Sequence, residues 1–289
     1  MASRRRERDD PHRAPQAPGA AQGTISTRVS PRLQALRNSA IALPHSSRWH
    51  PLSISANYPG LLQIPQLSLF QSQEALNALA TLKRVVNASL APASDTDIAW
   101  TPVKGDPSAP DRLDYREVTL PNPDLSSGQL KVCKNRAKQS FSGAPRALRM
   151  DQHYRELQNA GAALGAAALL LLRELPGMHD GLFFMATQIS SGPRDAKRTR
   201  HVDPQEIAAA LATFSIEGTA QIQMSHYAQG AAVCQRPPYD FECNTDKVYM
   251  LTGELDLWFA RHEVLVTSPN RIGVTLRFGA PGHPSSRRD

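Results

Sequence analysis

Apolar residues recur along this chain with two different spacings, and the change of spacing separates predicted helices from predicted strands. Gln73 to Leu90 carries apolar side chains every three or four positions and follows Ser72, a suitable N-cap, so this segment predicts an amphipathic helix. Asp151 to Leu175 predicts a second, longer helix that ends at Pro176-Gly177. Its alanine and leucine content indicates core packing rather than chemistry.

Short runs rich in β-branched and aromatic residues begin at Leu182 and are separated by turn residues. Several short strands in series predict an antiparallel sandwich or barrel. Shorter extended pieces precede them, one from Tyr58 onward and one near Arg116 to Leu120. Together with the two helices, this pattern predicts an α+β fold. The predicted strands in the C-terminal half are Leu182 to Ile189, Ala208 to Ile216, Ala220 to Met224, Lys247 to Leu251, Leu255 to Phe259, Val264 to Thr267 and Ile272 to Phe278.

Composition separates the two ends of the chain from a central domain. Residues 1–57 are rich in Arg, Pro, Ala, Ser and Gln, so they cannot bury enough apolar surface to offset the entropy lost on ordering. We therefore expect a disordered basic arm over 1–57, one folded domain over 58–279, and a disordered tail over 280–289. A domain of this size needs no disulfide or metal to fold.

Charge and cysteine content indicate which partners and which compartment the protein could have. The net charge of +7 permits a polyanionic partner such as nucleic acid, although much of the excess lies in the two tails. The three cysteines, Cys133, Cys234 and Cys243, lack zinc-type spacing and predict buried thiols in a reducing compartment, the nucleus or the cytoplasm. The longest apolar run, Ala160 to Leu172, is too short to span a bilayer, and the start lacks a secretory signal pattern. We expect no membrane association, and no obligate protein partner is evident.

Three residues form a candidate metal site. His201 and Asp203 make a His-x-Asp pair after a predicted strand, and His262 follows 61 residues later, just after Leu255 to Phe259. The pair alone also fits a solvated loop histidine beside an N-cap aspartate. Two histidines and one carboxylate make the facial triad of non-haem Fe(II) oxygenases, in which the opposite face of the metal stays open. We therefore assign His201, Asp203 and His262 as candidate Fe(II) ligands and as the catalytic centre.

The last predicted strand places two arginines on one face. Alternate side chains of a strand share a face, so Arg271, Gly273, Thr275 and Arg277 lie opposite an apolar face. The two arginine Cα atoms are about 20 Å apart at roughly 3.3 Å per residue, and long side chains leaning inward could grip a small dicarboxylate. Gly273 leaves room for a ligand. The alternative is a half-exposed edge strand with solvated arginines.

The C-terminal segment resembles the end of an AlkB-like Fe(II)/2-oxoglutarate-dependent dioxygenase. The resemblance rests on Asp246 to Glu254, which is similar to the family's strand and Gly-Glu turn, and on the distal His262 and the Arg271-x5-Arg277 strand. It implies a double-stranded β-helix, or jelly-roll, core with flanking N-terminal helices. It also implies Fe(II) held by His201, Asp203 and His262, and 2-oxoglutarate held by Arg271 and Arg277.

The segment before the His-x-Asp pair departs from this family. AlkB-like proteins usually carry an Asn-x-Tyr there, and both side chains help to hold 2-oxoglutarate. Ala186 to Gly192 contains neither Asn nor Tyr.

The resemblance implies oxidation of 2-oxoglutarate to succinate and CO₂, coupled to hydroxylation of a C–H bond. Where that carbon is an N-methyl group of methylated DNA or RNA, the outcome is oxidative N-demethylation. A basic run beside the metal site could dock phosphates or could be a solvated loop; it consists of Arg194, Lys197, Arg198 and Arg200. Two alternatives stay open. One is a 2-oxoglutarate oxygenase acting on a protein, lipid or small molecule, and the other is a catalytically inactive binding module on the same fold.

Overall fold

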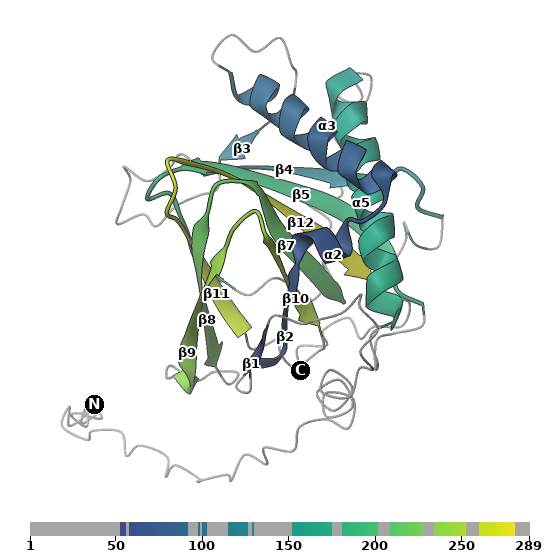
Figure 1. The fold of residues 1–289 in the computed structure, drawn as a ribbon. Coiled ribbons are helices and arrows are strands. Elements are labelled where there is room, and N and C mark those ends of the chain that lie inside the picture. Colours follow the sequence, from purple (N-terminus) through teal and green to yellow (C-terminus); the bar gives the residue numbers. More distant parts are fainter. Residues whose placement is uncertain are drawn as a thin grey trace, which may run out of the picture.

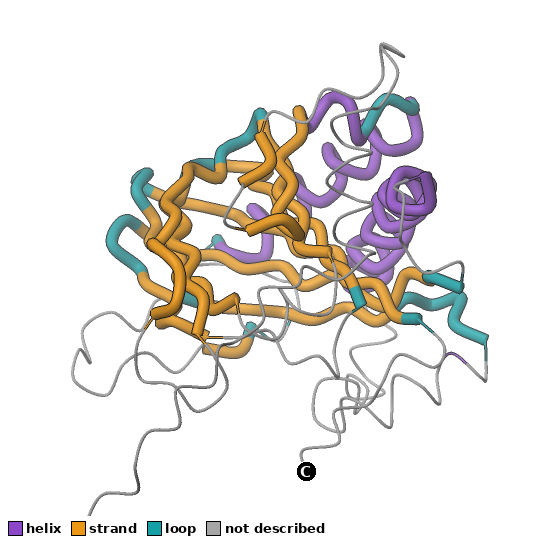
Figure 2. The backbone as a smooth tube through the Cα atoms, turned by 90° about the horizontal axis from the view of Figure 1, so that it is seen from below, coloured by secondary structure: helices purple, strands orange, loops and turns teal. Residues whose placement is uncertain are grey.

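Two antiparallel β-sheets face each other, and helices cover the outer face of the larger sheet (Figures 1 and 2). The computed structural model describes residues 53–55, 58–91, 98, 100–102, 115–126, 129, 152–174, 181–201, 209–227, 234–252 and 260–280. None of the helices in these ranges is long and apolar enough to cross a membrane.

The order of the strands defines a jelly-roll. The helices are α2 (Gln66–Leu69), α3 (Gln73–Leu90) and α5 (Gln152–Glu174). The larger sheet contains, in spatial order, β1 (Ser53–Ser55), β2 (Tyr58–Pro65), β10 (Lys247–Thr252), β7 (Ala210–Glu217), β12 (Asn270–Gly279), β5 (Phe183–Pro193), β4 (Arg116–Pro121) and β3 (Thr101–Pro102). The smaller sheet contains β6 (Lys197–His201), β11 (Ala260–Val266), β8 (Ala220–Tyr227) and β9 (Cys234–Cys243). The predicted α+β class with a double-stranded β-helix core and flanking helices is confirmed.

Both faces of the large sheet are buried, and they are buried against different partners. On the outer face of β12, Ile272, Val274, Leu276 and Phe278 belong to the main core, together with buried residues of α3 and α5. On the inner face, Leu211 and Tyr249 join a second apolar cluster with residues of the small sheet such as Ile222. The predicted apolar face of the last strand is therefore the face that meets the helices.

The two long helices form where the sequence predicts them. Ser72 caps α3, because its Oγ accepts a hydrogen bond from the backbone N–H of Ala75 at 3.1 Å. Helix α5 lies close against β5 because two of its buried positions are glycine. A Cβ atom at Gly165 would lie 2.4 Å from the Phe184 ring, and one at Gly161 would lie 2.2 Å from the Thr187 hydroxyl.

Four strands were not predicted from the sequence: β1, β3, β6 and β9. Strand β6 reads Lys-Arg-Thr-Arg-His and β9 contains two prolines, so neither has an apolar pattern of its own. They form by pairing with β11 and β8. The interpretation of the basic run as a loop is thus wrong from Lys197 onward. Strand β1 begins inside the segment predicted as an arm, whereas Leu255 to Phe259 lies outside the described residues.

The close contact of α5 with β5 generates a stability prediction. In Gly165→Ala the added methyl would gain about 1 kcal/mol of helix propensity, but it must displace the Phe184 ring. We expect the free energy of unfolding to fall by about 1–3 kcal/mol, as in other overpacked cores. Chemical denaturation measures the change. The control is Ala166→Gln on the exposed face of α5, which should leave stability within about 0.5 kcal/mol of wild type. Equal stability of Gly165→Ala and wild type would contradict this packing.

Candidate functional site

The sandwich has a closed end and an opposite end at which the candidate ligands lie. Short turns join β5 to β6, β7 to β8, β9 to β10 and β11 to β12, and the register of the strands places all four turns at one end. In the β7–β8 turn Gly218 has a φ of 68°, a backbone conformation that favours glycine. Strands β6 and β8 finish at the opposite end, where His201 is the last residue of β6.

Strand pairing brings the two candidate metal-binding histidines together. His262 and His201 are direct partners across the antiparallel pair of β11 and β6. Such partners have Cα atoms about 4.5–5.5 Å apart and project to the same face. A bulge between His262 and Val264 sets this register. The cross-strand partner of His262 on β8, Met224, lies in the apolar cluster between the sheets. His262 therefore belongs to the inner face of the small sheet.

This pairing fits a metal site whose third ligand lies outside the described residues. His262 is 5% exposed, and it lies within β11 rather than after the preceding strand as the sequence predicted. Only the backbone of His201 is described, and Asp203 falls in the range 202–208, outside the described residues. The described ranges accordingly contain no group of three metal-binding side chains. Imidazole ligands suit Fe(II), and both the His201 side chain and the Asp203 carboxylate stay predictions as ligands.

Arg271 is a buried cation without a carboxylate partner in the described part of the chain. It is 2% exposed. Its Nε donates to Ser215 Oγ at 3.0 Å and its Nη2 donates to Cys243 Sγ at 3.6 Å. No carboxylate of the described residues comes within 4.0 Å of its guanidinium. A buried charge that lacks a counter-ion is costly, so this site is chemically suited to an incoming anion.

The surroundings of Arg271 keep it charged. Burial by itself lowers the pKa of Arg271, but the Cys243 thiol and then the phenols of Tyr115 and Tyr249 outweigh burial. The pKa therefore lies above the ordinary value of an arginine. The guanidinium stays positive throughout the range in which a carboxylate ligand is negative.

Gly273 has a different role from the one predicted. The sequence suggested that its missing side chain leaves room for a ligand, but the Arg271 guanidinium occupies that room. A Cβ at Gly273 would lie 2.7 Å from Nη1 and 2.8 Å from Cζ of Arg271. The side chain of Arg271 thus lies along β12 toward Arg277, which shortens the gap of about 20 Å between the two Cα atoms.

Arg277 and the residues between the two arginines complete a polar inner face. Arg277 is 5% exposed, and its Nη2 donates to Gln188 Oε1. The hydroxyls of Thr213 and Thr275 share a hydrogen bond of 2.9 Å between the two arginines. Because β12 lies between β7 and β5 and both arginines are buried, the alternative of an exposed edge strand is wrong.

Two cations of the basic run form ion pairs within the fold. Arg198 Nη1 forms an ion pair with Glu117 Oε1, and Lys197 Nζ lies 2.9 Å from Glu263 Oε1. Glu117 Oε2 also accepts a hydrogen bond of 2.6 Å from Gln188 Nε2. Gln188 and Glu117 were missed in the sequence because neither belongs to a motif. The alternation of side chains along β5 and β4 could have identified both residues, but only once the register of these strands with β12 is known.

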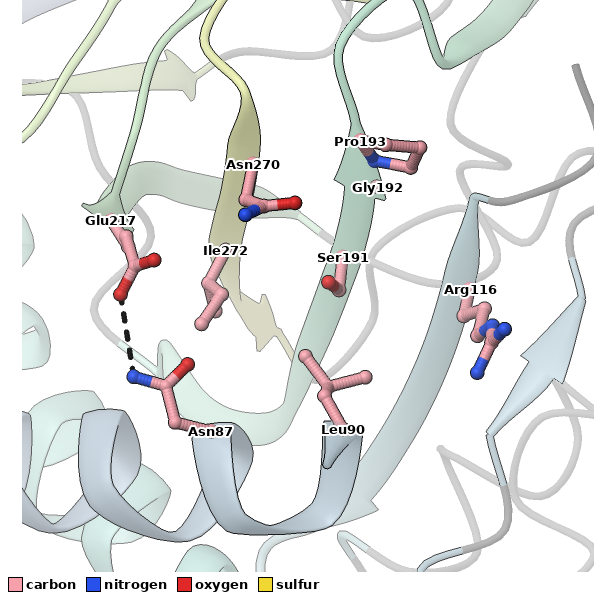
Figure 3. Close-up of a pocket in the computed structure, with 9 residues that line it drawn as sticks. All are labelled: Asn87, Leu90, Arg116, Ser191, Gly192, Pro193, Glu217, Asn270 and Ile272. Atoms are coloured by element: carbon pink, nitrogen blue, oxygen red, sulfur yellow. Dashed lines mark hydrogen bonds between the residues drawn. The ribbon is translucent and has the colours of Figure 1, made fainter. Parts of the chain in front are cut away.

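A separate cavity of about 380 Å³ lies elsewhere on the large sheet, near its closed end (Figure 3). Its lining comes from the end of α3 and from β4, β5, β7 and β12, and Asn87 donates to Glu217 at 3.3 Å across it. None of the predicted site residues lines this cavity. It is therefore distinct from the candidate metal and co-substrate site.

Comparison with known proteins gives similarities at the level of solved structures. No family model and no curated protein matches the chain. A 2OG-Fe(II) oxygenase family oxidoreductase from Burkholderia pseudomallei is similar at 16% identity with a TM-score of 0.46, covering 79% of this chain and 89% of its own. A prolyl hydroxylase from Trichoplax adhaerens, in complex with a hypoxia inducible factor peptide fragment, has 9% identity and a TM-score of 0.47, with coverage of 90% and 99%. OsALKBH1 has 13% identity and a TM-score of 0.45, with coverage of 75% and 97%.

The crowding at Gly273 generates a prediction about the anion site. In Gly273→Ala the methyl must push the Arg271 guanidinium away from β12, so the variant should lose a charge-assisted pair with a bound dicarboxylate. We expect 2-oxoglutarate affinity to fall by about 10- to 100-fold, the equivalent of roughly 1.5–3 kcal/mol. Calorimetric titration of the anaerobic Fe(II) protein measures this.

The matched control is Gly181→Ala at an exposed turn position, which should bind 2-oxoglutarate like wild type. Unaltered affinity in a folded Gly273→Ala protein would place the anion away from Arg271.

Proposed function

We propose that this protein is an Fe(II)- and 2-oxoglutarate-dependent dioxygenase. The observation that carries the proposal is Arg271, a cation buried between the sheets with no carboxylate beside it in the described residues. The free-energy cost of burying this charge is offset if the site binds a carboxylate ligand. The proposed metal ligands His201 and His262 are backbone partners across β6 and β11 of the same sandwich, which supports the proposal.

Each side chain has a distinct part in this proposal. His201, His262 and, from the sequence, Asp203 hold Fe(II), which when bound supplies the redox chemistry with O₂. Arg271 grips the distal carboxylate of 2-oxoglutarate, and Arg277 supports the other end. The hydroxyls of Thr213 and Thr275 lie between the arginines and offer polar contacts to the co-substrate. The balanced reaction converts 2-oxoglutarate, O₂ and a C–H bond into succinate, CO₂ and a hydroxylated carbon.

Methylated DNA or RNA is the first substrate we propose, in the nucleus or the cytoplasm. The net charge of +7 and the resemblance to AlkB-like proteins support oxidative N-demethylation of a polyanion. Hydroxylation of an N-methyl carbon gives a product that loses formaldehyde and leaves the demethylated amine.

A second candidate is an oxygenase acting on a protein, lipid or small molecule. The observation that favours it is that Lys197 and Arg198 pair with Glu263 and Glu117. Two cations of the basic run are thereby engaged within the fold instead of facing a phosphate backbone. A comparison of methylated oligonucleotides with peptide and metabolite pools as substrates distinguishes the two candidates.

The dioxygenase proposal predicts metal-dependent binding and turnover. Anaerobic titration of Fe(II) and 2-oxoglutarate should give a weak visible charge-transfer band, and admission of air should then give succinate. Band and succinate together support the oxygenase. Well-folded protein that gives neither signal would leave the third possibility, a catalytically inactive binding module on the same fold.

If Arg271 binds a carboxylate ligand, replacing it should affect ligand binding more than the stability of the unliganded protein. Replacing a buried charge by an apolar side chain of similar length is often neutral or stabilising, by about 1–4 kcal/mol. We expect Arg271→Met without ligand to be at least as stable as wild type in thermal or chemical unfolding. The same variant should lose the stabilisation that 2-oxoglutarate confers on wild type.

Arg84→Met is the control, because Arg84 is exposed and pairs with Glu156 at 2.5 Å on the helices. It should change stability by less than about 1 kcal/mol and keep the response to 2-oxoglutarate. A loss of several kcal/mol in unliganded Arg271→Met would instead make the arginine a structural residue.

A further inference from the structure

Arg271 is held by a hydroxyl and a thiol that come from different strands and from both sheets. Ser215 of β7 is the backbone partner of Gly273 on β12, so its hydroxyl lies beside the room that the Arg271 guanidinium occupies. Cys243 is the last residue of β9 in the small sheet. Arg271 donates from Nε to Ser215 Oγ at 3.0 Å and from Nη2 to Cys243 Sγ at 3.6 Å. All three residues are buried, so these contacts form away from solvent.

The hydroxyl of Ser215 is itself fixed in the orientation that makes it an acceptor for Arg271. A hydroxyl has one proton to donate. Ser215 Oγ donates to the backbone carbonyl of Cys243 at 3.4 Å, and Cys243 Sγ lies 3.6 Å from the same oxygen. With its proton directed at Cys243, the Ser215 oxygen presents a lone pair to Arg271 Nε. The three residues therefore form one closed set of contacts around the guanidinium.

These contacts leave the end of the Arg271 guanidinium open. An arginine has five N–H donors in a planar fork, one on Nε and two on each Nη. The two contacts use the Nε donor and one Nη2 donor, and the described residues offer no further acceptor to Arg271. The donors that stay available are the two of Nη1 and the second of Nη2, which form the end of the fork. Two parallel donors of this kind match the two oxygens of one carboxylate.

We propose that Ser215 and Cys243 are positioning residues that hold Arg271 by its Nε and Nη2 edge, so that the end of the fork receives the distal carboxylate of the co-substrate. The inference rests on the proposed function, because 2-oxoglutarate supplies that carboxylate. Both partners suit this role because neither is a carboxylate, so they fix the side chain and leave its charge for the ligand. A guanidinium that is fixed beforehand also loses less entropy when the ligand binds.

The test compares two oxoacids as ligands of full-length wild type and Ser215→Ala, by calorimetric titration of the anaerobic Fe(II) proteins. 2-Oxopentanoate has the same carbon chain and the same oxoacid end as 2-oxoglutarate, but it lacks the distal carboxylate. We expect Ser215→Ala to bind 2-oxoglutarate about 5- to 30-fold more weakly, because Arg271 loses its fixed orientation. Its affinity for 2-oxopentanoate should stay within about twofold of wild type, because that ligand has no charge for Arg271 to bind. In turnover, KM for 2-oxoglutarate should rise with kcat little changed.

Ser225→Ala is the matched control, because Ser225 is also buried and also donates to a backbone carbonyl, that of Arg261, at 3.4 Å. No contact among the described residues joins Ser225 to Arg271, so this variant should bind both oxoacids like wild type. If Ser215→Ala does not fold, Cys243→Ala removes the other partner and must show the same selective loss. That loss should be smaller, because a thiol is the weaker acceptor.

An equal loss of affinity for both oxoacids in the folded variant would make Ser215 a purely structural residue and overturns the inference. Unchanged 2-oxoglutarate affinity overturns it as well. Both results leave the dioxygenase proposal standing, because the wild-type protein still binds Fe(II) and 2-oxoglutarate. Wild-type protein that binds Fe(II) but neither oxoacid overturns the proposed function and the inference together.

Discussion

Arg271 is buried between the two sheets, and its burial determines what kind of ligand the interior can bind. A guanidinium removed from water is expensive, and here its described partners are a hydroxyl and a thiol rather than a carboxylate. The cost is tolerated because the sandwich is large and well packed on both faces of its eight-stranded sheet. Such a cation contributes little to the stability of the fold, but it favours the binding of an anion.

The fold places this cation and His262 in one interior. Strand β12 is central in the large sheet, so its polar face is enclosed by the small sheet while its apolar face meets the helices. Strand β6 is an edge strand of five residues, and β11 pairs with it along one side. The ion pair of Arg198 with Glu117 adds a tie from β6 to the large sheet, so the strand that carries His201 is anchored from both sheets.

Much of this arrangement follows from the sequence, and the rest depends on pairing that no local pattern encodes. Alternation alone placed Arg271 and Arg277 on one face of β12, and helical spacing with a cap gave α3. Alternation did not reveal that Gly273 accommodates the Arg271 guanidinium, because that depends on a side-chain conformation. Strand β6 was missed because its polar residues acquire strand structure only through β11. The Gln188–Glu117–Arg198 contacts join strands far apart in the chain, and only the register of the sheets makes them neighbours.

In the proposed site, one metal ion binds at His201 and His262, and one carboxylate ligand binds at Arg271. The most direct measurement is a crystal structure of the anaerobic protein with Fe(II) and 2-oxoglutarate, with anomalous scattering recorded at the iron edge. We expect an iron peak between the two histidines, with Asp203 as a further ligand, and a carboxylate on the Arg271 guanidinium. Iron bound elsewhere, or an Arg271 side chain without a carboxylate in a fully loaded crystal, would contradict the proposed site.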